Sequence, residues 1–247
     1  MEKDKKITED IPEGLASVIT DAYHALREVT CVEDVYDLID YLVEEVKHHY
    51  THISCKIGCD SCCTALHPPF ISAAEWEYIL YYINDFPQII KDEIVRRGRW
   101  FAAEYRDALL LQIALAKGEI PPQEMEKTYK TLSRALKISA CPFLVIDRCG
   151  IYPVRPAKCR AHGYFLVQIG ETIRVHTCLP EVSNWEEFLR KQNHRRLTMP
   201  LWNVFEKVIS ILNPPDSLVA TIPVWLITHI SGNKLLTEVN PNPKINL

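Results

Sequence analysis

The chain has 247 residues, 47% of them hydrophobic and 24% charged, and a formal net charge of −4. These values are ordinary for a globular protein, and a chain of this length can bury a core without disulfide bonds. The slight acidity and the scattered basic residues exclude the electrostatic footprint of a nucleic-acid-binding protein, so no nucleic-acid partner is expected.

Neither a secretory signal nor a membrane span is expected. Residues 1–10 are polar and mixed in charge, without the apolar stretch of a signal peptide. The most apolar segment, residues 218–230, is too short to cross a bilayer and contains Pro223 and His229. We therefore expect a cytoplasmic protein with no membrane partner. Thiols stay reduced in that compartment, which favours metal binding or catalysis over disulfides.

The N-terminal third reads as amphipathic helix. Apolar residues recur at spacings of three and four over residues 15–26 and again over residues 35–46. Thr30 and Glu33 have the spacing of a capping box at the start of the second helix. Cys31 falls in the first turn of that helix and is expected to be a plain buried or half-buried thiol.

The middle of the chain continues with helices. Ser72 and Glu75 form another possible capping box, a long helix is expected over residues 91–117 with Gly118 as its C-cap, and Pro121 and Pro122 begin the next helix.

The hydrophobic period then changes. Residues 143–146 and 150–152 read as short strands, and residues 165–169 and 172–176 read as a hairpin around Gly170 and Glu171. Helices resume with Ser183 and Glu186 as a cap and continue to the break at Pro214 and Pro215.

These elements predict a mainly α fold, with helices packed around a cysteine-rich metal-binding centre and a small β-hairpin region. Residues 1–50 supply N-terminal helices, residues 51–182 form a cysteine-cluster metal-binding domain with inserted helices, and residues 183–247 supply C-terminal helices. We expect the three segments to form one compact unit.

Eight of the nine cysteines fall into two clusters. The first reads Cys55-x3-Cys59-x2-Cys62-Cys63, in a segment with Gly58 and little periodicity. A loop lets several sulfurs converge at the roughly 2.3 Å that tetrahedral zinc requires, and cluster iron takes the same thiolate ligands. The second comprises Cys141, Cys149, Cys159 and Cys178.

Arg155 and Arg160 lie beside the second cluster in the sequence. Four thiolates around a metal or an iron–sulfur cluster leave a net negative charge. We expect these two arginines to offset that charge and to donate hydrogen bonds to sulfur.

Three blocks together resemble the YkgJ-type cysteine-cluster family. They are the first cluster, then Cys141-Pro142-Phe143-Leu144, then Cys149-Gly150-Ile151-Tyr152-Pro153-Val154-Arg155-Pro156-x2-Cys159-Arg160. That family is described as a zinc- or iron-chelating domain and includes proteins related to flagellin lysine N-methylase. The resemblance covers about residues 55–178 and implies a metal centre held by cysteines.

The number and composition of the centres stay open. Eight thiols suit one site with spare cysteines or two four-cysteine sites, and Cys62 and Cys63, being adjacent, are candidates for two different centres. His52, His67, His162 and His176 lie near cluster cysteines in the sequence, with His162 the best of them, but eight thiols already satisfy two four-ligand sites.

Two kinds of enzyme are alternatives to a cysteine-ligated metal site. Cys55-x3-Cys59-x2-Cys62 has the spacing of radical S-adenosylmethionine enzymes, but helices rather than an apolar strand precede it. The glycines form no G-x-G turn for a conventional methyltransferase cofactor.

The leading prediction is therefore a protein that binds zinc or an iron–sulfur cluster in a structural or redox role. The alternatives are an enzyme that modifies a side chain of a protein substrate, in the manner of lysine N-methylase, and an interaction module with a structural zinc and a protein partner.

Overall fold

The computed structural model describes residues 13–56, 58–64, 68–136, 141–145, 148–191 and 197–244. These residues form eleven α-helices and four two-stranded antiparallel sheets, so the predicted mainly α fold is confirmed. No helix within the described residues is long and apolar enough to cross a membrane. The predictions for residues 1–10 and for His67 lie outside this part of the chain.

The first hydrophobic cluster joins the N-terminal helices to the C-terminal half of the chain. Its buried residues include Val35, Phe165 and Phe205. It is built by α1 (Glu13–Ala25), α2 (Val32–His49), α8 (Ala157–Ala161), β4 (Leu166–Ile169), β5 (Thr172–Val175), α9 (Leu179–Lys191) and α10 (Trp202–Leu212).

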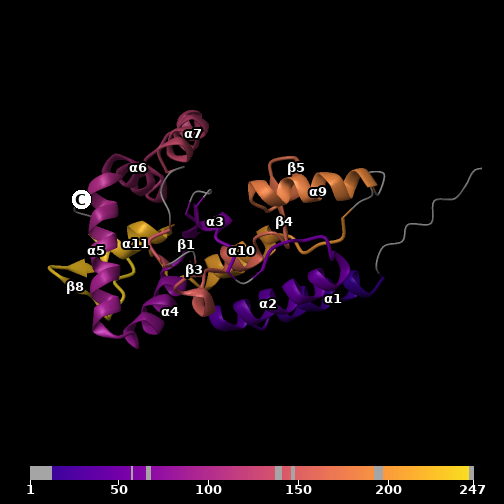
Figure 1. The fold of residues 1–247 in the computed structure, drawn as a ribbon, viewed down its shortest axis with the longest axis horizontal. Helices are drawn as coiled ribbons and strands as arrows, with labels where there is room; N and C mark the ends of the chain where they lie inside the picture. The colour runs from indigo at the N-terminus through magenta and orange to yellow at the C-terminus, as the bar shows by residue number, and fades with distance from the viewer. Residues whose placement is uncertain are drawn as a thin grey trace, which may run out of the picture.

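The second hydrophobic cluster lies at the other end of the long axis of the molecule (Figure 1). Trp76 and Trp225 stack at its centre, with ring centroids 6.3 Å apart. Its helices are α4 (Ala73–Asn84), α5 (Gln88–Glu104), α6 (Arg106–Ala116), α7 (Met125–Leu136) and α11 (Ile222–Thr228).

Short elements occupy the space between the two clusters. Figure 1 places α3 (Ser61–Thr64) and β3 (Arg148–Cys149) there. β3 pairs with β2 (Leu144–Val145), and β1 (Phe70–Ile71) pairs with β6 (Ala220–Thr221). Elsewhere, β7 (Ile230–Ser231) pairs with β8 (Lys234–Leu235) beside α5, and two 3-10 turns complete the set, η1 (Pro122–Glu124) and η2 (Tyr152–Val154). Most cluster cysteines belong to these elements or to the loops beside them. The division into residues 1–50, 51–182 and 183–247 stays a prediction.

The capping box of α4 is confirmed and does more than end a helix. The Ser72 hydroxyl accepts a hydrogen bond from the Glu75 amide, and the Glu75 carboxylate accepts from the Ser72 amide. The other carboxylate oxygen accepts from the Ala157 amide at 3.0 Å and from the Tyr36 hydroxyl at 3.2 Å. This buried carboxylate therefore fixes the start of α8, which carries Cys159.

The hairpin is also confirmed, with register from Leu166↔Val175 to Ile169↔Thr172. The cap of α2, in contrast, is one residue later than predicted. Cys31 is the N-cap, and it is exposed instead of buried because this position lies at the open end of the helix. The Asp34 carboxylate accepts hydrogen bonds from the backbone amides of Thr30 and Cys31.

The single helix expected over residues 91–117 is wrong, because α5 and α6 are separated at Tyr105. The Tyr105 ring packs on Phe101 with centroids 4.7 Å apart, and its backbone leaves the helical region at φ −114° and ψ 26°. Helix α6 ends at Ala116 with Lys117 as its C-cap, and Gly118 follows with φ +68°. This end agrees within one residue with the predicted end of the helix.

Two further boundaries differ from the sequence predictions. Tyr152–Val154 is a 3-10 turn instead of a strand, because Pro153 removes a backbone donor. The helix expected from Ser183 already begins at Leu179, since the Glu181 amide donates to the Cys178 sulfur one turn earlier.

Candidate metal centre

The two cysteine segments meet through their main chains. The backbone amide of Cys141 donates a 2.9 Å hydrogen bond to the carbonyl oxygen of Cys63, and the amide of Cys63 donates to the carbonyl of Asp60 at 2.7 Å. This contact spans 78 positions of the sequence, from Cys63 to Cys141. The predicted proximity of the two segments is therefore a feature of the fold.

The charges of the cysteines raise one another's pKa values within two sets, and Cys62 acts on members of both. A charged thiolate raises the pKa of a thiol near it, so these effects report which cysteines are neighbours. We call Cys55, Cys59, Cys62 and Cys178 the first cysteine group, and Cys63, Cys141, Cys149 and Cys159 the second cysteine group.

Cys62 lies between the two groups. Its sulfur is 4.0 Å from the Cys63 sulfur, and its charge also raises the pKa values of Cys141, Cys149 and Cys159. The adjacent pair Cys62 and Cys63, in the single turn of α3, thus gives one cysteine to each group.

A small cavity of about 60 Å³ opens among the thiols, and we call it the cysteine cavity. It has room for roughly two waters, at about 30 Å³ each. Five cysteines line it, namely Cys55, Cys59, Cys62, Cys159 and Cys178. Four cationic side chains line it too, Lys47, Lys56, Arg155 and Arg160. Cations beside thiols favour the thiolate form, which is the form that binds metal.

Three backbone amides favour the charged form of nearby cysteines. The amides of Phe143, Ile151 and Glu181 lower the pKa values of Cys141, Cys149 and Cys178, respectively. This effect is smaller at each of the three cysteines than the effect of burial.

Burial works in the opposite direction. It is the largest effect on Cys55, Cys141, Cys149, Cys159 and Cys178, and it raises the pKa of each, that of Cys141 to about 12. The Cys62–Cys63 contact lowers the pKa of Cys62, which accepts the hydrogen bond, and raises that of Cys63, which donates it. Most of these buried thiols keep their protons unless a cation replaces them.

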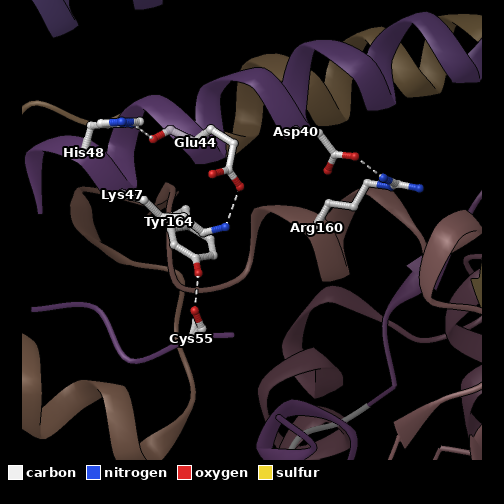
Figure 2. Close-up of polar contacts among 7 residues, drawn as sticks. All are labelled: Asp40, Glu44, Lys47, His48, Cys55, Arg160 and Tyr164. Atoms are coloured by element: carbon white, nitrogen blue, oxygen red, sulfur yellow. Dashed lines mark hydrogen bonds and ion pairs between the residues drawn. The ribbon is translucent and has the colours of Figure 1, made fainter. Parts of the chain in front are cut away.

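The two arginines have different positions. Arg160 is buried and forms an ion pair with Asp40 of α2, while its other nitrogens donate to the carbonyls of Arg155 and Pro153 (Figure 2). Its guanidinium lies 4.3 Å from the centre of the Tyr36 ring. Arg160 therefore fastens α8 to α2.

Arg155 acts on more of the thiols than Arg160 does. Its guanidinium lies over the Tyr152 ring at 4.1 Å, and its buried Nε has no hydrogen-bond partner. Its charge lowers the pKa values of Cys62, Cys149 and Cys159. Hydrogen bonds from either arginine to sulfur stay a prediction.

Cys55 is held by the loop after α8. The hydroxyl of Tyr164 donates a 2.7 Å hydrogen bond to the Cys55 carbonyl, and the Lys47 ammonium lies 5.4 Å from the centre of the Tyr164 ring (Figure 2). Gly163 has φ +89°, and a Cβ atom there would be 2.7 Å from the Cys55 sulfur. Only glycine lets this loop approach that sulfur.

Sequence reasoning missed Glu181, which is 1% exposed. One oxygen of its carboxylate accepts hydrogen bonds from the amide and the hydroxyl of Ser54, and the other has no partner. Its charge raises the pKa values of Cys55 and Cys178. Its place three residues after Cys178 was the available signal, but helix-cap reasoning selected Ser183 and Glu186.

The histidines fall in different surroundings. His52 stacks on Phe188 with centroids 4.1 Å apart and lies among aromatic rings. His162 lines the cysteine cavity and contacts His176. Burial lowers the pKa of His162 to about 4 and that of His176 to about 3, so both rings are neutral at pH 7.

The donor set has the composition of a soft-metal site, but it is not closed around a point. Within the described residues, no three His, Cys, Asp or Glu side chains are close enough together to hold a metal ion. Protonated thiols gain no free energy by converging, because only the thiolate form binds metal. A cysteine sulfur moves between staggered positions by rotation about one bond, so the main-chain arrangement sets which thiols can meet.

Comparison of the chain with protein-family models, with curated proteins and with solved structures gave no match. The functional reading therefore depends on the residues and contacts described above.

Proposed function

We propose that this protein binds a transition metal, as zinc or as an iron–sulfur cluster, through its two cysteine groups, and that the centre has a structural or redox role. The resemblance to the YkgJ-type family motivates the proposal. The observation that carries it is the cysteine cavity, where five thiols and four cationic side chains meet, because cations beside thiols favour the thiolate form that binds metal.

The residues that would hold the metal are the eight cysteines, four from each group. When bound, zinc would supply folding free energy and an iron–sulfur cluster would supply electron transfer as well. Arg155, Lys47 and Lys56 would offset the negative charge of the thiolates, since all three line the cysteine cavity.

One observation favours an enzyme as the second candidate. A pocket of about 390 Å³ reaches two thiols, Cys62 and Cys159, and its other lining residues include Lys158, Arg174 and Tyr129. A closed structural site needs no such approach, whereas a centre that acts on a substrate keeps an open side. The candidate substrate is a protein side chain, as the family resemblance implies.

The experiment is anaerobic purification of the full chain, followed by metal analysis, an absorption spectrum and thiol titration. We expect one or two metal equivalents per chain, colourless with zinc or brown with absorption near 400 nm with an iron–sulfur cluster.

Three cysteine variants locate the metal. Cys178→Ser removes a ligand from the first cysteine group and Cys159→Ser removes one from the second, so each is expected to lower the metal content. Cys31→Ser is the matched control, since that exposed thiol caps α2 away from both groups. Folded, metal-free parent protein with eight titratable cluster thiols would refute the proposal.

A further inference from the structure

A buried histidine with an unpaired ring nitrogen lines the cysteine cavity. His162 is 8% exposed, and its Nε2 has no hydrogen-bond partner among the described residues. Leaving a buried polar atom unpaired is unfavourable, so such a nitrogen beside a cavity indicates a ligand for it. The same imidazole lines the cavity beside the sulfurs of the first cysteine group.

The other ring nitrogen of His162 is occupied. Its Nδ1 is 3.3 Å from Nε2 of His176, and the two rings meet edge to face with centroids 4.6 Å apart. The two nitrogens of an imidazole lie at different edges of the ring, so Nε2 of His162 is turned away from His176. His176 and His162 both line the larger outer pocket.

The contact between Nδ1 of His162 and Nε2 of His176 needs one proton, which either ring can supply. When His162 donates it from Nδ1, its Nε2 carries the lone pair that a metal ligand requires.

We infer that Nε2 of His162 is a nitrogen ligand of the metal held by the first cysteine group, with His176 as the residue that orients it. This inference rests on the proposed function. A ligating histidine almost always donates its second ring N–H to a partner that fixes its orientation, and His176 supplies that partner here. Mixed sulfur and imidazole ligation suits zinc and also certain iron–sulfur centres.

The position of His162 in the chain explains how it reaches the sulfurs. It is the C-cap residue of α8, whose helix carries Cys159, and the next residue is Gly163, which lies against the sulfur of Cys55. Cys55, Cys159 and His162 accordingly line the same cavity.

The test is X-ray absorption spectroscopy of the anaerobically purified full chain, at the edge of whichever metal analysis finds. We expect a sulfur shell together with an imidazole shell. His162→Gln should abolish the imidazole shell and weaken metal affinity by at least about tenfold. His48→Gln is the matched control, because that exposed ring bonds only the Glu44 carbonyl of its own helix (Figure 2).

The outcomes separate this inference from the proposed function. A metal with a sulfur-only shell, or an imidazole shell that survives in His162→Gln, overturns the inference and leaves metal binding intact. A parent protein without metal overturns both.

A second measurement does not depend on the folding of any variant. In metal-free protein with 15N-labelled histidine, NMR should show His162 protonated at Nδ1 and not at Nε2. The opposite tautomer overturns the inference.

Discussion

Replacing Gly163 with alanine tests the placement of Cys55 directly. The backbone at this residue has φ +89°, and the new Cβ atom would be 2.7 Å from the Cys55 sulfur. An alanine in the left-handed region costs about 1–2 kcal/mol. The contact with sulfur is shorter than real Cβ contacts, and relieving overpacking of this kind costs about 1–3 kcal/mol more.

Gly170→Ala provides the matched control. Gly170 also has positive φ, +59°, in the hairpin turn, but no atom lies within 4 Å of the position its Cβ would take. This variant is expected to lose only the backbone cost, about 1–2 kcal/mol. The difference between the two variants therefore isolates the displacement of the Cys55 sulfur.

Urea unfolding and metal analysis would be measured on both variants. We expect Gly163→Ala to lose about 2–5 kcal/mol of unfolding free energy and a share of its metal, and Gly170→Ala to keep its full metal content. Equal losses of stability with unchanged metal in both would refute the argument, since the Cys55 sulfur would then not lie against this turn.

Two further predictions concern groups away from the thiols. Glu75→Ala leaves the buried amides of Ser72 and Ala157 without an acceptor and should cost about 3 kcal/mol of unfolding free energy. Glu77→Ala, at an exposed position of the same helix, is the control and should change little. Similar unfolding midpoints for the two variants would contradict this prediction. Burial lowers the pKa of His229, whose neutral Nε2 accepts a hydrogen bond from the Asn240 amide. The neutral ring therefore stabilises the fold above pH 6.5. This stabilisation is lost as the pH falls below 6.5, at up to about 1.4 kcal/mol per pH unit. The hydrogen-exchange protection factor of that amide should fall on acidification, and a pH-independent protection factor would count against this prediction.

Local patterns predicted the local structure. The capping box of Ser72 and Glu75 and the hairpin around Gly170 were predictable, because each depends on residues a few positions apart. The break at Tyr105 was not, since its cause is a ring that packs on Phe101 where no glycine or proline marks the sequence.

The residue types of the candidate site were predictable from the sequence, but the contacts between them were not. The spacing of the cysteines suggested that they converge, but the assignment of Cys62 and Cys63 to different groups depends on the turn of α3. Arg160 lines the cysteine cavity as expected, but its ion pair with Asp40, 120 positions away, was not predictable. Partners at such separations are set by packing, which short sequence patterns do not encode.

The first hydrophobic cluster has a consequence for synthesis of the chain. It joins α2, complete at His49, to Ile209 in α10, so α2 emerges from the ribosome well before its last partner. At about 5–20 residues per second, that interval of 160 residues lasts roughly 8–32 s. During this time the nascent chain presents the thiols of Cys55–Cys63 before Cys178 exists.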